Sequence, residues 1–334
     1  MRSLAVLTSG GDSPGMNPAI RSITRAALHI GLGVWGIKNG YQGLLDDEFI
    51  PLDALVVSGK NREGGTFLQT ARCAAFLSED KQREAVEILR RRKIDGLVVI
   101  GGDGSLHGAL ALHNLGFPTI GIPGTIDNDI YGTDAGIGVD TALNTIISLV
   151  DMIKATASSH RRCFVVEVMG RQCGYLALMT TISTGSQVAV IPEFPYNFPR
   201  IIDTLEKRFA SKHNNSVIIV AEGVMSGAEF MRRLKEEALA IGKTVRQELR
   251  LTVLGHVQRG GSPTHFDRLL ASRMGEMAVQ ALIKGESGKM TALLGNTIIL
   301  QDLKSILGRP NPLPPDAIRV AQNLGIEIGD APRP

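Results

Sequence analysis

The sequence predicts an α/β protein of two lobes, each with a mostly parallel sheet flanked by helices. Short apolar, β-branched runs alternate along the chain with longer amphipathic segments, as in strands joined by helices. Several of these runs end directly in glycine-rich or polar loops. With 334 residues, 43% of them hydrophobic, the chain is long enough for two domains with their own cores.

The first half of the chain contains the first series of elements. Apolar runs predict strands over 4–7, 33–38, 97–100 and 117–122. The helical spacing of Ile20, Ile23, Ala27 and Ile30 predicts a helix over 17–30. A charged amphipathic segment predicts another over 79–92, and Ser105 opens a third.

A second series begins near Gly138, where we place the boundary between the lobes. We expect its strands over 163–168, 187–191, 216–221 and 250–254. We expect helices over 140–156, 174–184, 199–211, 229–241, 267–284 and 315–324. This recurring strand–helix unit predicts two Rossmann-like lobes. Ligands of such sheets bind beyond the carboxyl ends of the strands, so we expect the active site in the cleft between the lobes.

Composition excludes several classes of function. The net charge is +3 and aromatic residues make up 4%, so neither nucleic-acid binding nor a membrane surface is expected. Three cysteines without metal-ligand spacing (Cys73, Cys163 and Cys173) are typical of a reducing, cytoplasmic setting. No signal peptide or membrane span is expected, because glycine or charge interrupts every long apolar run.

The segment from Leu97 to Leu110, LVVIGGDGSLHGAL, joins a strand to a helix through Gly101-Gly102-Asp103-Gly104. Backbone N–H groups at such a turn suit a phosphate. Asp103 would repel a bare phosphate, so we interpret it as a ligand for Mg²⁺ carried by the phosphates. The alternative is a tight turn in which Asp103 is a solvated cap. Thr8 to Gly15 forms a second loop of the same kind.

Polar residues that suit phosphoryl transfer follow other strands. Asp127 and Asp129, in the loop Thr125-Ile126-Asp127-Asn128-Asp129, can divide the roles of base and metal ligand. The alternative for this loop is an Asx-type turn with solvated carboxylates. Planar donors for phosphate are supplied by Arg72, Arg162, Arg171, Arg250 and Arg259. His256 alone is more typical of a structural residue, but with Gln258 and Arg259 it favours a sugar-phosphate clamp.

The combined motifs resemble bacterial ATP-dependent 6-phosphofructokinases over essentially the whole chain. The residues that carry the resemblance are Gly10-Gly11-Asp12, Gly65-Thr66 with Arg72, GGDGS at 101–105, PGTIDND at 123–129, MGR at 169–171, Glu222 and GHVQRGGSP at 255–263. The resemblance implies transfer of the γ-phosphoryl group of ATP to the 1-hydroxyl of fructose 6-phosphate, a step of glycolysis.

The resemblance also implies roles for individual residues. Asp127 would be the base, and Thr125 and Arg171 would stabilise the transferring group. Mg²⁺, the expected cofactor, would bind Asp103 with help from Asp129. The ATP site would contain Gly11, Tyr41, Arg72, Cys73, Gly102, Asp103, Gly104 and Ser105. The sugar-phosphate site would contain Thr125, Ile126, Asp127, Arg162, Met169, Gly170, Arg171, Glu222, Arg250, His256, Val257, Gln258 and Arg259.

The lobes and the assembly follow from the same resemblance. An ATP- and Mg²⁺-binding lobe would comprise 1–138 and about 258–308. A sugar-phosphate lobe would comprise 139–257 and about 309–334. The family is typically an allosteric homotetramer, in which some of the sugar-phosphate arginines reach in from a neighbouring subunit.

Two sets of positions bear on the phosphoryl donor and on regulation. Pyrophosphate-using relatives carry aspartate at the position of Gly104 and lysine at that of Gly124, so both glycines favour ATP. Arg21, Arg25 and Lys154 fit a cationic effector site, although a solvated helix face is the alternative for the two arginines. Ala54, Gln187, Ser211 and His213 depart from the charged residues usual there, so we expect altered effectors.

Three other functions share part of this pattern. Pyrophosphate as donor is the nearest in mechanism. A dinucleotide-dependent oxidoreductase would need a G-x-G-x-x-G fingerprint after the first strand and an acid about 20 residues on, which the sequence does not contain. A non-catalytic sugar-phosphate sensor would not need the base that Asp127 supplies.

Overall fold

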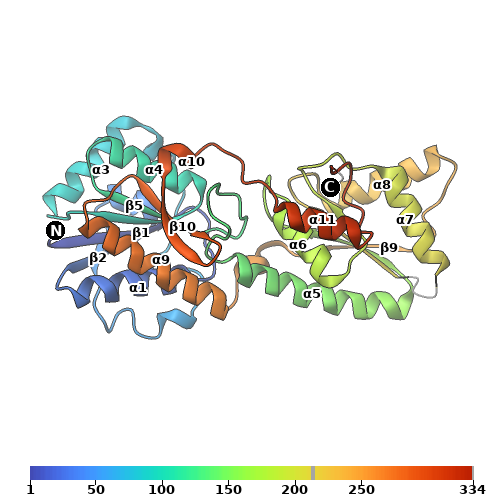
Figure 1. The fold of residues 1–334 in the computed structure, drawn as a ribbon, viewed down its shortest axis with the longest axis horizontal. Helices are drawn as coiled ribbons and strands as arrows, with labels where there is room; N and C mark the ends of the chain where they lie inside the picture. The colour runs from blue at the N-terminus through green and yellow to red at the C-terminus, as the bar shows by residue number, and fades with distance from the viewer. Residues whose placement is uncertain (212–214, 333–334) are drawn as a thin grey trace. The chain divides into compact units, whose positions relative to one another are not determined.

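The computed structural model describes residues 1–211 and 215–332, and it confirms the predicted α/β class, with mostly parallel sheets flanked by helices (Figure 1). The chain divides into two compact units. Unit 1 comprises 1–126, 130–141 and 259–311, and unit 2 comprises 127–129, 142–258 and 312–334. Among the described residues, no helix is both long and apolar enough to span a membrane.

Unit 1 contains a seven-stranded sheet in the order β11-β10-β5-β4-β1-β2-β3. Its strands are β1 (Ser3–Ser9), β2 (Gly33–Ile37), β3 (Phe49–Pro51), β4 (Leu97–Gly101), β5 (Thr119–Pro123), β10 (Lys289–Leu294) and β11 (Thr297–Asp302). Its helices are α1 (Met16–His29), α2 (Gly40–Leu45), η1 (Lys60–Arg62), η2 (Ala74–Leu77), α3 (Glu79–Arg91), α4 (Asp103–Asn114), α9 (His265–Ile283) and α10 (Leu303–Ile306). Neighbouring strands are parallel except where β3 joins β2 and β11 joins β10.

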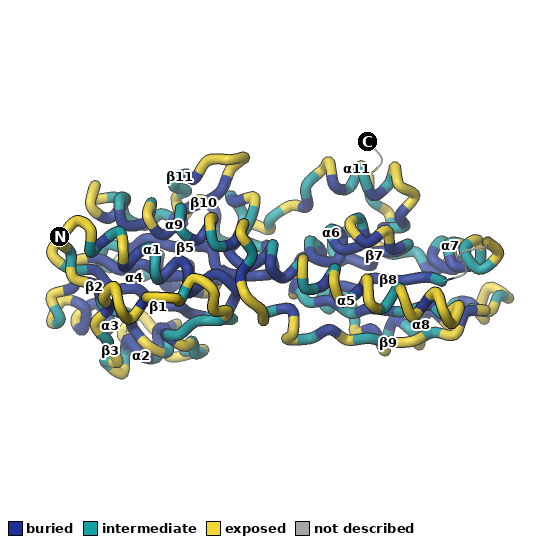
Figure 2. Tube along the Cα trace, turned by 90° about the horizontal axis from the view of Figure 1, so that it is seen from below, coloured by how far each residue is buried: buried dark blue, intermediate teal, exposed yellow. Residues whose placement is uncertain are grey.

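Both faces of this sheet are covered, because successive strand residues point to opposite sides. Leu4 and Val6 of β1 pack with α1 and α9 on one face. Ala5 and Leu7 pack with α2, α3 and α4 on the other. The central strands β1, β4 and β5 are accordingly buried along almost their whole length, whereas the edge strands β3 and β11 are mostly half-buried or exposed (Figure 2).

The strand order changes direction between β1 and β4, which pair in register from Ala5↔Leu97 to Ser9↔Gly101. From β1 the chain builds outward through β2, whereas β4 leads to β5 on the other side. Loops diverge at such a switch point and leave room for a ligand. The two glycine loops after β1 and β4 therefore lie at the point of the sheet where a ligand site is expected.

Unit 2 contains a four-stranded parallel sheet in the order β7-β8-β6-β9. Its strands are β6 (Cys163–Val168), β7 (Val188–Val190), β8 (Ser216–Ala221) and β9 (Leu249–Val253). Its helices are α5 (Val139–His160), which begins in unit 1, α6 (Tyr175–Thr184), α7 (Phe198–Ala210), α8 (Gly227–Ala240), α11 (Pro315–Asn323) and the turn η3 (Gly255–Arg259), whose last residue belongs to unit 1. Helices α7 and α8 share one buried core with β6, β7 and β8.

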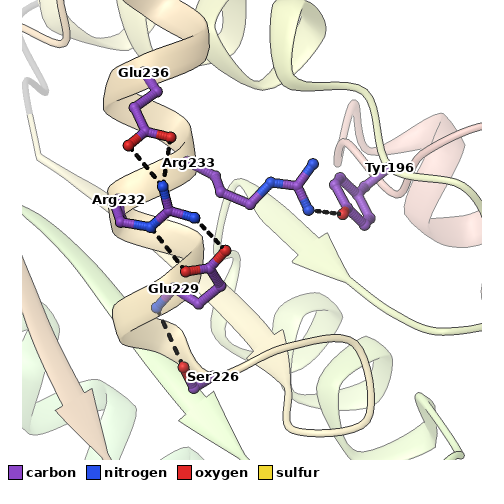
Figure 3. A network of polar contacts seen from close by, with 6 residues as sticks. All are labelled: Tyr196, Ser226, Glu229, Arg232, Arg233 and Glu236. Atoms are coloured by element: carbon purple, nitrogen blue, oxygen red, sulfur yellow. Dashed lines mark hydrogen bonds and ion pairs between the residues drawn. The ribbon is translucent and has the colours of Figure 1, made fainter.

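Helix α8 carries an ion-pair network on its outer surface (Figure 3). Arg232 pairs with Glu229 one turn before it and with Glu236 one turn after it. Arg233 donates to the Tyr196 hydroxyl at 2.8 Å, which ties the helix to the segment before α7. The side chains of Arg232, Glu229 and Glu236 are largely exposed, so their ion pairs add little to the free energy of unfolding.

The hairpin of β10 and β11 was not predicted from the sequence. Its two strands are joined by Gly295 and Asn296, and Gly295 has φ of +58°. A Gly-Asn pair between two apolar runs is a hairpin signal, and it was the only local indication. Strand β5 also starts later than predicted, at Thr119, because Phe117 closes the turn after α4 by donating to Leu112 O.

A buried carboxylate, Asp267, holds together the starts of α5 and α9. It accepts hydrogen bonds from the backbone N–H groups of Gly138 and Thr141, both at 2.8 Å, and from the Thr141 hydroxyl at 2.5 Å. Burial raises the pKa of Asp267 from 3.8 to about 6, although these hydrogen bonds oppose the shift. The folded protein therefore binds a proton at Asp267 over a pH range in which the unfolded chain has released it.

We expect the stability difference between the wild type and Asp267→Asn to change with pH. The raised pKa of Asp267 means that its proton stabilises the folded state. This contribution to the free energy of unfolding is fully present below about pH 4 and is lost as the pH rises through about 6. The free energy of unfolding of the wild type, minus that of the variant, should fall over this range by up to about 3 kcal/mol. Urea unfolding of both proteins from pH 4 to 7 measures this difference. A difference that stays constant with pH would contradict the raised pKa of Asp267.

Candidate active site

The loop after β4 places a helix N-terminus beside glycines. An added Cβ at Gly101 would lie 2.5 Å from Ser9 O, so this position needs glycine. At Gly104 an added Cβ would meet nothing within 4 Å, and at Gly102 it would lie 3.8 Å from Thr125 Cβ. The backbone N–H groups that open α4 therefore border open space, which is what a polyphosphate requires.

The loop after β1 lies against Arg259. The Arg259 guanidinium donates from Nη1 to Asp12 O at 3.0 Å, and the same nitrogen would lie 2.7 Å from a Cβ at Gly11. Arg259 was predicted to bind sugar phosphate, and Gly11 to bind ATP. Within unit 1 the structure places these two predicted residues in contact.

Tyr41 packs against the first turn of α4, after the β4 loop. Its hydroxyl donates to Ser105 O at 2.7 Å, and its ring stacks on Phe76 with centroids 4.0 Å apart. Burial raises the pKa of this tyrosine. Cys73 packs against the same core, whereas Arg72 is exposed. Three of the residues predicted to bind ATP lie in this region. Tyr41 and Cys73 are part of the packed wall beside the β4 loop, and Arg72 lies at the surface.

Asn17 organises the segment that leads to Arg72, and the sequence analysis missed it. Its buried amide donates to Glu63 O at 3.2 Å and Gly64 O at 3.1 Å, and its Oδ1 accepts from Phe67 N at 2.8 Å. One side chain thereby satisfies three backbone groups of an irregular loop. The available signal was an amide in the first turn of a helix that follows a glycine loop.

In unit 2, the loops after β6 and β8 meet. Arg171 N donates to Glu222 Oε1 at 3.1 Å, and Glu222 N donates to Val168 O. A Cβ at Gly223 would lie 1.8 Å from Arg171 O, so only glycine fits there. Arg171 has φ of +50° and Gly170 has φ of +132°, and a non-glycine residue in this region stores strain. Glu222 thus holds the Arg171 backbone in an unusual conformation.

The turn η3 after β9 contributes Gln258 to the same set of loops. Its Oε1 accepts from Met169 N at 3.1 Å, and its Nε2 donates to Gly255 O at 2.9 Å. The side chain is fully buried, whereas His256 and Val257 are exposed. Gln258, predicted among the substrate residues, therefore bonds the backbone of the Met169 loop.

The TIDND loop follows β5 and passes from unit 1 to unit 2. Thr125 and Ile126 are buried in unit 1. In unit 2 the Asp127 side chain is 2% exposed, and its Oδ2 lies 3.3 Å from Arg171 Nε, whose side chain is 55% exposed. Asn128 has φ of +51°, which turns the backbone between the two aspartates. The structure thus brings together Asp127 and Arg171, the predicted base and the predicted cation.

Two further side chains lie behind this loop, and the sequence analysis missed them. Burial, together with the nearby carboxylates of Glu193, Asp129 and Asp127, raises the pKa of Cys173 to about 12. Burial also raises the pKa of Glu193, which accepts from Gly174 N at 2.7 Å. Cys173 is thus an unreactive, buried thiol that packs beside the TIDND loop. No sequence motif marks either residue.

Arg162 and Arg250 lie at the other end of the unit 2 sheet. Both pair with Glu248, Arg162 through Nε at 2.6 Å and Arg250 through Nη2. Arg162 precedes β6 and Arg250 is the second residue of β9, whereas the Met169 loop follows the carboxyl end of β6. A strand of six residues is about 20 Å long. Within one chain the structure does not bring these two arginines to the Met169 and Glu222 loops.

The donor set suits a hard cation carried by phosphates. Asp103 opens α4, and Asp129 lies in unit 2. No group of three or more histidine, cysteine, aspartate or glutamate side chains forms a metal site in the described part of the chain. Mg²⁺ in kinases commonly binds one or two carboxylates and the substrate phosphates, so carboxylates of this kind fit it.

The predicted effector residues occupy different settings. Arg21 is half-buried and Arg25 exposed on α1, and Ala54 and Ser211 are exposed. Lys154 donates from Nζ to Thr184 O, and burial lowers its pKa. Gln187 accepts from Val217 N at 2.8 Å and donates to Gly185 O at 3.0 Å, so its amide serves the backbone. His213 lies outside the described residues.

Comparisons with known proteins agree on one family. A family model described as Phosphofructokinase matches residues 3–282. ATP-dependent 6-phosphofructokinases of Shouchella clausii and Listeria monocytogenes are each 47% identical over 326 residues, 98% of this chain and 100% of theirs. The Saccharomyces cerevisiae phosphofructokinase structure has a TM-score of 0.83 at 36% identity, over 91% of this chain and 45% of its own. A pyrophosphate-dependent phosphofructokinase from Marinobacter aquaeolei shares the fold, with a TM-score of 0.81 at 19% identity over 100% of this chain and 93% of its own. This chain belongs to the phosphofructokinase family.

Proposed function

We propose that this chain is an ATP-dependent 6-phosphofructokinase, which transfers the γ-phosphoryl group of ATP to the 1-hydroxyl of fructose 6-phosphate. The products are fructose 1,6-bisphosphate and ADP. The observation that carries the proposal is the buried Asp127 carboxylate with Arg171 Nε at 3.3 Å. Support comes from the name of relatives 47% identical over nearly the whole chain.

The reaction needs a base and a cation at the transferring group. Asp127 accepts the proton of the 1-hydroxyl as its oxygen attacks the γ-phosphorus. The bond from that phosphorus to the bridging oxygen breaks, and ADP leaves. Arg171 and Thr125 stabilise the charge on the transferring group. The strained Arg171 backbone, held by Glu222, orients the guanidinium in advance.

The nucleotide is assigned to residues of unit 1. Its phosphates lie on the N-terminus of α4 at Gly102 to Ser105, and beside Gly11. The wall of Tyr41 and Cys73 and the surface residue Arg72 complete its site. Asp103, with help from Asp129, would hold Mg²⁺, which would neutralise the charge of the phosphates.

The sugar phosphate is assigned mainly to residues of unit 2. Met169, Gly170, Glu222, His256 and Val257 supply the loops, and Gln258 fixes the backbone of the Met169 loop. Ile126 is assigned to the same substrate from the loop after β5. The sugar phosphate group binds to arginines, for which Arg162, Arg250 and Arg259 are the candidates.

The positions of Arg162 and Arg250 favour self-association. Each lies about a strand length from the Met169 loop of its own chain, so a second copy has to bring them to the substrate. The nearby edge strand β9 leaves Val253 54% exposed, and the turn after it leaves Val257 56% exposed. Exposed apolar groups at an unpaired edge are typical of an interface. We assign a homotetramer, as expected for the family.

Mixing two inactive variants should restore activity if sites are shared between copies. One variant is Asp127→Ser and the other Arg162→Ala combined with Arg250→Ala. A hybrid oligomer contains some sites with both the intact carboxylate and the intact arginines. After dissociation and reassembly together, the activity should rise at least about tenfold above either variant reassembled alone. No gain in confirmed hybrids would contradict shared sites.

Regulation is assigned to the cationic residues Arg21, Arg25 and Lys154, which suit an anionic metabolite. Gln187 replaces a carboxylate that would hold the Mg²⁺ of a nucleotide effector, and its amide bonds backbone groups instead. The enzyme should therefore not be activated by ADP. Three free thiols and the metabolites of glycolysis agree with a cytoplasmic location.

An initial-rate assay tests the function. Purified protein is given fructose 6-phosphate with Mg²⁺ and either ATP or pyrophosphate, with and without ADP, phosphoenolpyruvate and other metabolite anions. The proposal requires fructose 1,6-bisphosphate to form with ATP. Product formed with pyrophosphate alone would assign the other donor, and no product with either would refute the kinase assignment.

A further inference from the structure

The Asp103 carboxylate contacts one other polar side chain in the described part of the chain, the imidazole of His107. His107 Nδ1 lies 3.3 Å from Asp103 Oδ2 and 3.0 Å from Asp103 O. The two residues are four apart on α4, so they share one face of the helix. Because both neighbours of Nδ1 are oxygen acceptors, the proton of the imidazole belongs on Nδ1.

The surroundings show that His107 is not a packing residue. Its side chain is 51% exposed and that of Asp103 is 48% exposed. Because about half of each side chain is exposed, Asp103 and His107 lie on the solvent-facing side of α4. Gly104, the residue after Asp103, also borders open space, whereas the next turn of the helix packs on Tyr41 at Gly108.

We propose that His107 is a positioning residue that orients the Asp103 carboxylate for the divalent cation. This inference rests on the metal role given to Asp103 in the proposed function. A carboxylate at the start of a helix rotates freely about its side-chain bonds, and a fixed donor removes part of that freedom. Carboxylates that bind metals are commonly held by such hydrogen bonds, and losing one weakens the metal affinity about 10- to 100-fold.

Two substitutions separate the hydrogen bond from the bulk of the ring. His107→Leu removes the donor, and His107→Gln keeps an N–H group that reaches a residue four earlier. We expect His107→Leu to raise the Mg²⁺ concentration for half-maximal rate about tenfold, and His107→Gln to reverse most of that increase. Turnover at saturating Mg²⁺, and the affinity for metal-free ATP measured by calorimetry in chelator, should not change.

Two readouts do not depend on catalysis. Mn²⁺ binding in the presence of ADP, followed by the paramagnetic signal of the free ion, should weaken in His107→Leu by a similar factor. In the metal-free protein, ¹⁵N spectra should show the His107 proton on Nδ1, with a signal that moves in Asp103→Asn. His113→Leu, at the other end of α4, is the matched control, because its Nδ1 lies 2.8 Å from Ser287 Oγ and not near Asp103.

Each outcome decides the proposal. Unchanged Mg²⁺ dependence and Mn²⁺ binding in His107→Leu would overturn it, as would a proton on Nε2. An equal loss of affinity for metal-free ATP would show that His107 contacts the nucleotide, which also overturns it. If the wild type fails to phosphorylate fructose 6-phosphate, the proposed function falls, while Mn²⁺ binding and the ¹⁵N spectra still decide the role of His107.

Discussion

Asp127→Ser should lower the turnover number by about 10²- to 10⁴-fold, the usual contribution of a general base. Without the carboxylate, the 1-hydroxyl has no acceptor for its proton as the γ-phosphoryl group arrives. The concentration of fructose 6-phosphate at half-maximal rate should change by no more than a few-fold, because the sugar phosphate is held by other residues. Steady-state rates with ATP and fructose 6-phosphate measure both quantities.

The structure indicates that this variant will fold. Arg171 loses its partner, but its side chain is 55% exposed, so water can solvate the guanidinium. Asp203→Ser, at an exposed site of α7 where Asp203 pairs with Lys243, is the control for removing an acidic residue from unit 2. Direct titration with fructose 6-phosphate should give nearly the same affinity for both variants. Turnover retained within a few-fold in Asp127→Ser would remove Asp127 from the role of base.

The alternation of strands and helices was predictable because each element has a local signature. The strand at Leu97–Gly101 is a continuous apolar run that ends at glycines, and buried parallel strands have this pattern. The hairpin at 289–302 was not predicted, because β10 pairs with both β5 and β11 in a way that no local pattern specifies. Its one local signal, Gly295-Asn296, is too short to distinguish it from other glycine turns.

The site shows a similar division. Asp127 and Arg171 are far apart in sequence, and each could be singled out because it sits in a polar motif after a strand. Asn17 and Glu193 could not, because their roles depend on which backbone N–H and C=O groups the tertiary fold brings to them. The separation of Arg162 from the Met169 loop likewise follows from the strand direction in unit 2. The family resemblance implied only that some of the sugar-phosphate arginines come from a neighbouring subunit, without indicating which.

Gly104→Asp should raise the KM for ATP by on the order of 10- to 100-fold. Two unit charges 4 Å apart repel by about 1 kcal/mol in water and about 4 kcal/mol near a protein surface. A repulsion between these limits raises the KM for ATP by about 10- to 100-fold, because each factor of ten corresponds to about 1.4 kcal/mol. The KM for fructose 6-phosphate should stay near its wild-type value, because residue 104 belongs to the nucleotide loop.

The folded state should accept this aspartate. A Cβ at Gly104 meets nothing within 4 Å, and a carboxylate in the first turn of a helix interacts favourably with the helix dipole. Gly104→Asn is the matched control, because it has the same size without the charge. If Asn and Asp raise the KM for ATP equally, the size of the side chain and not its charge weakens ATP binding. Unchanged ATP kinetics in both variants would refute the argument that Gly104 favours ATP as the phosphoryl donor.

Gly124 differs, because a Cβ there would lie 3.0 Å from Ile100 Cγ2 and 3.3 Å from Met16 Cε. Lysine at 124 therefore requires the core to move, so residue 104 is the position at which the choice of donor can be tested without disturbing the fold.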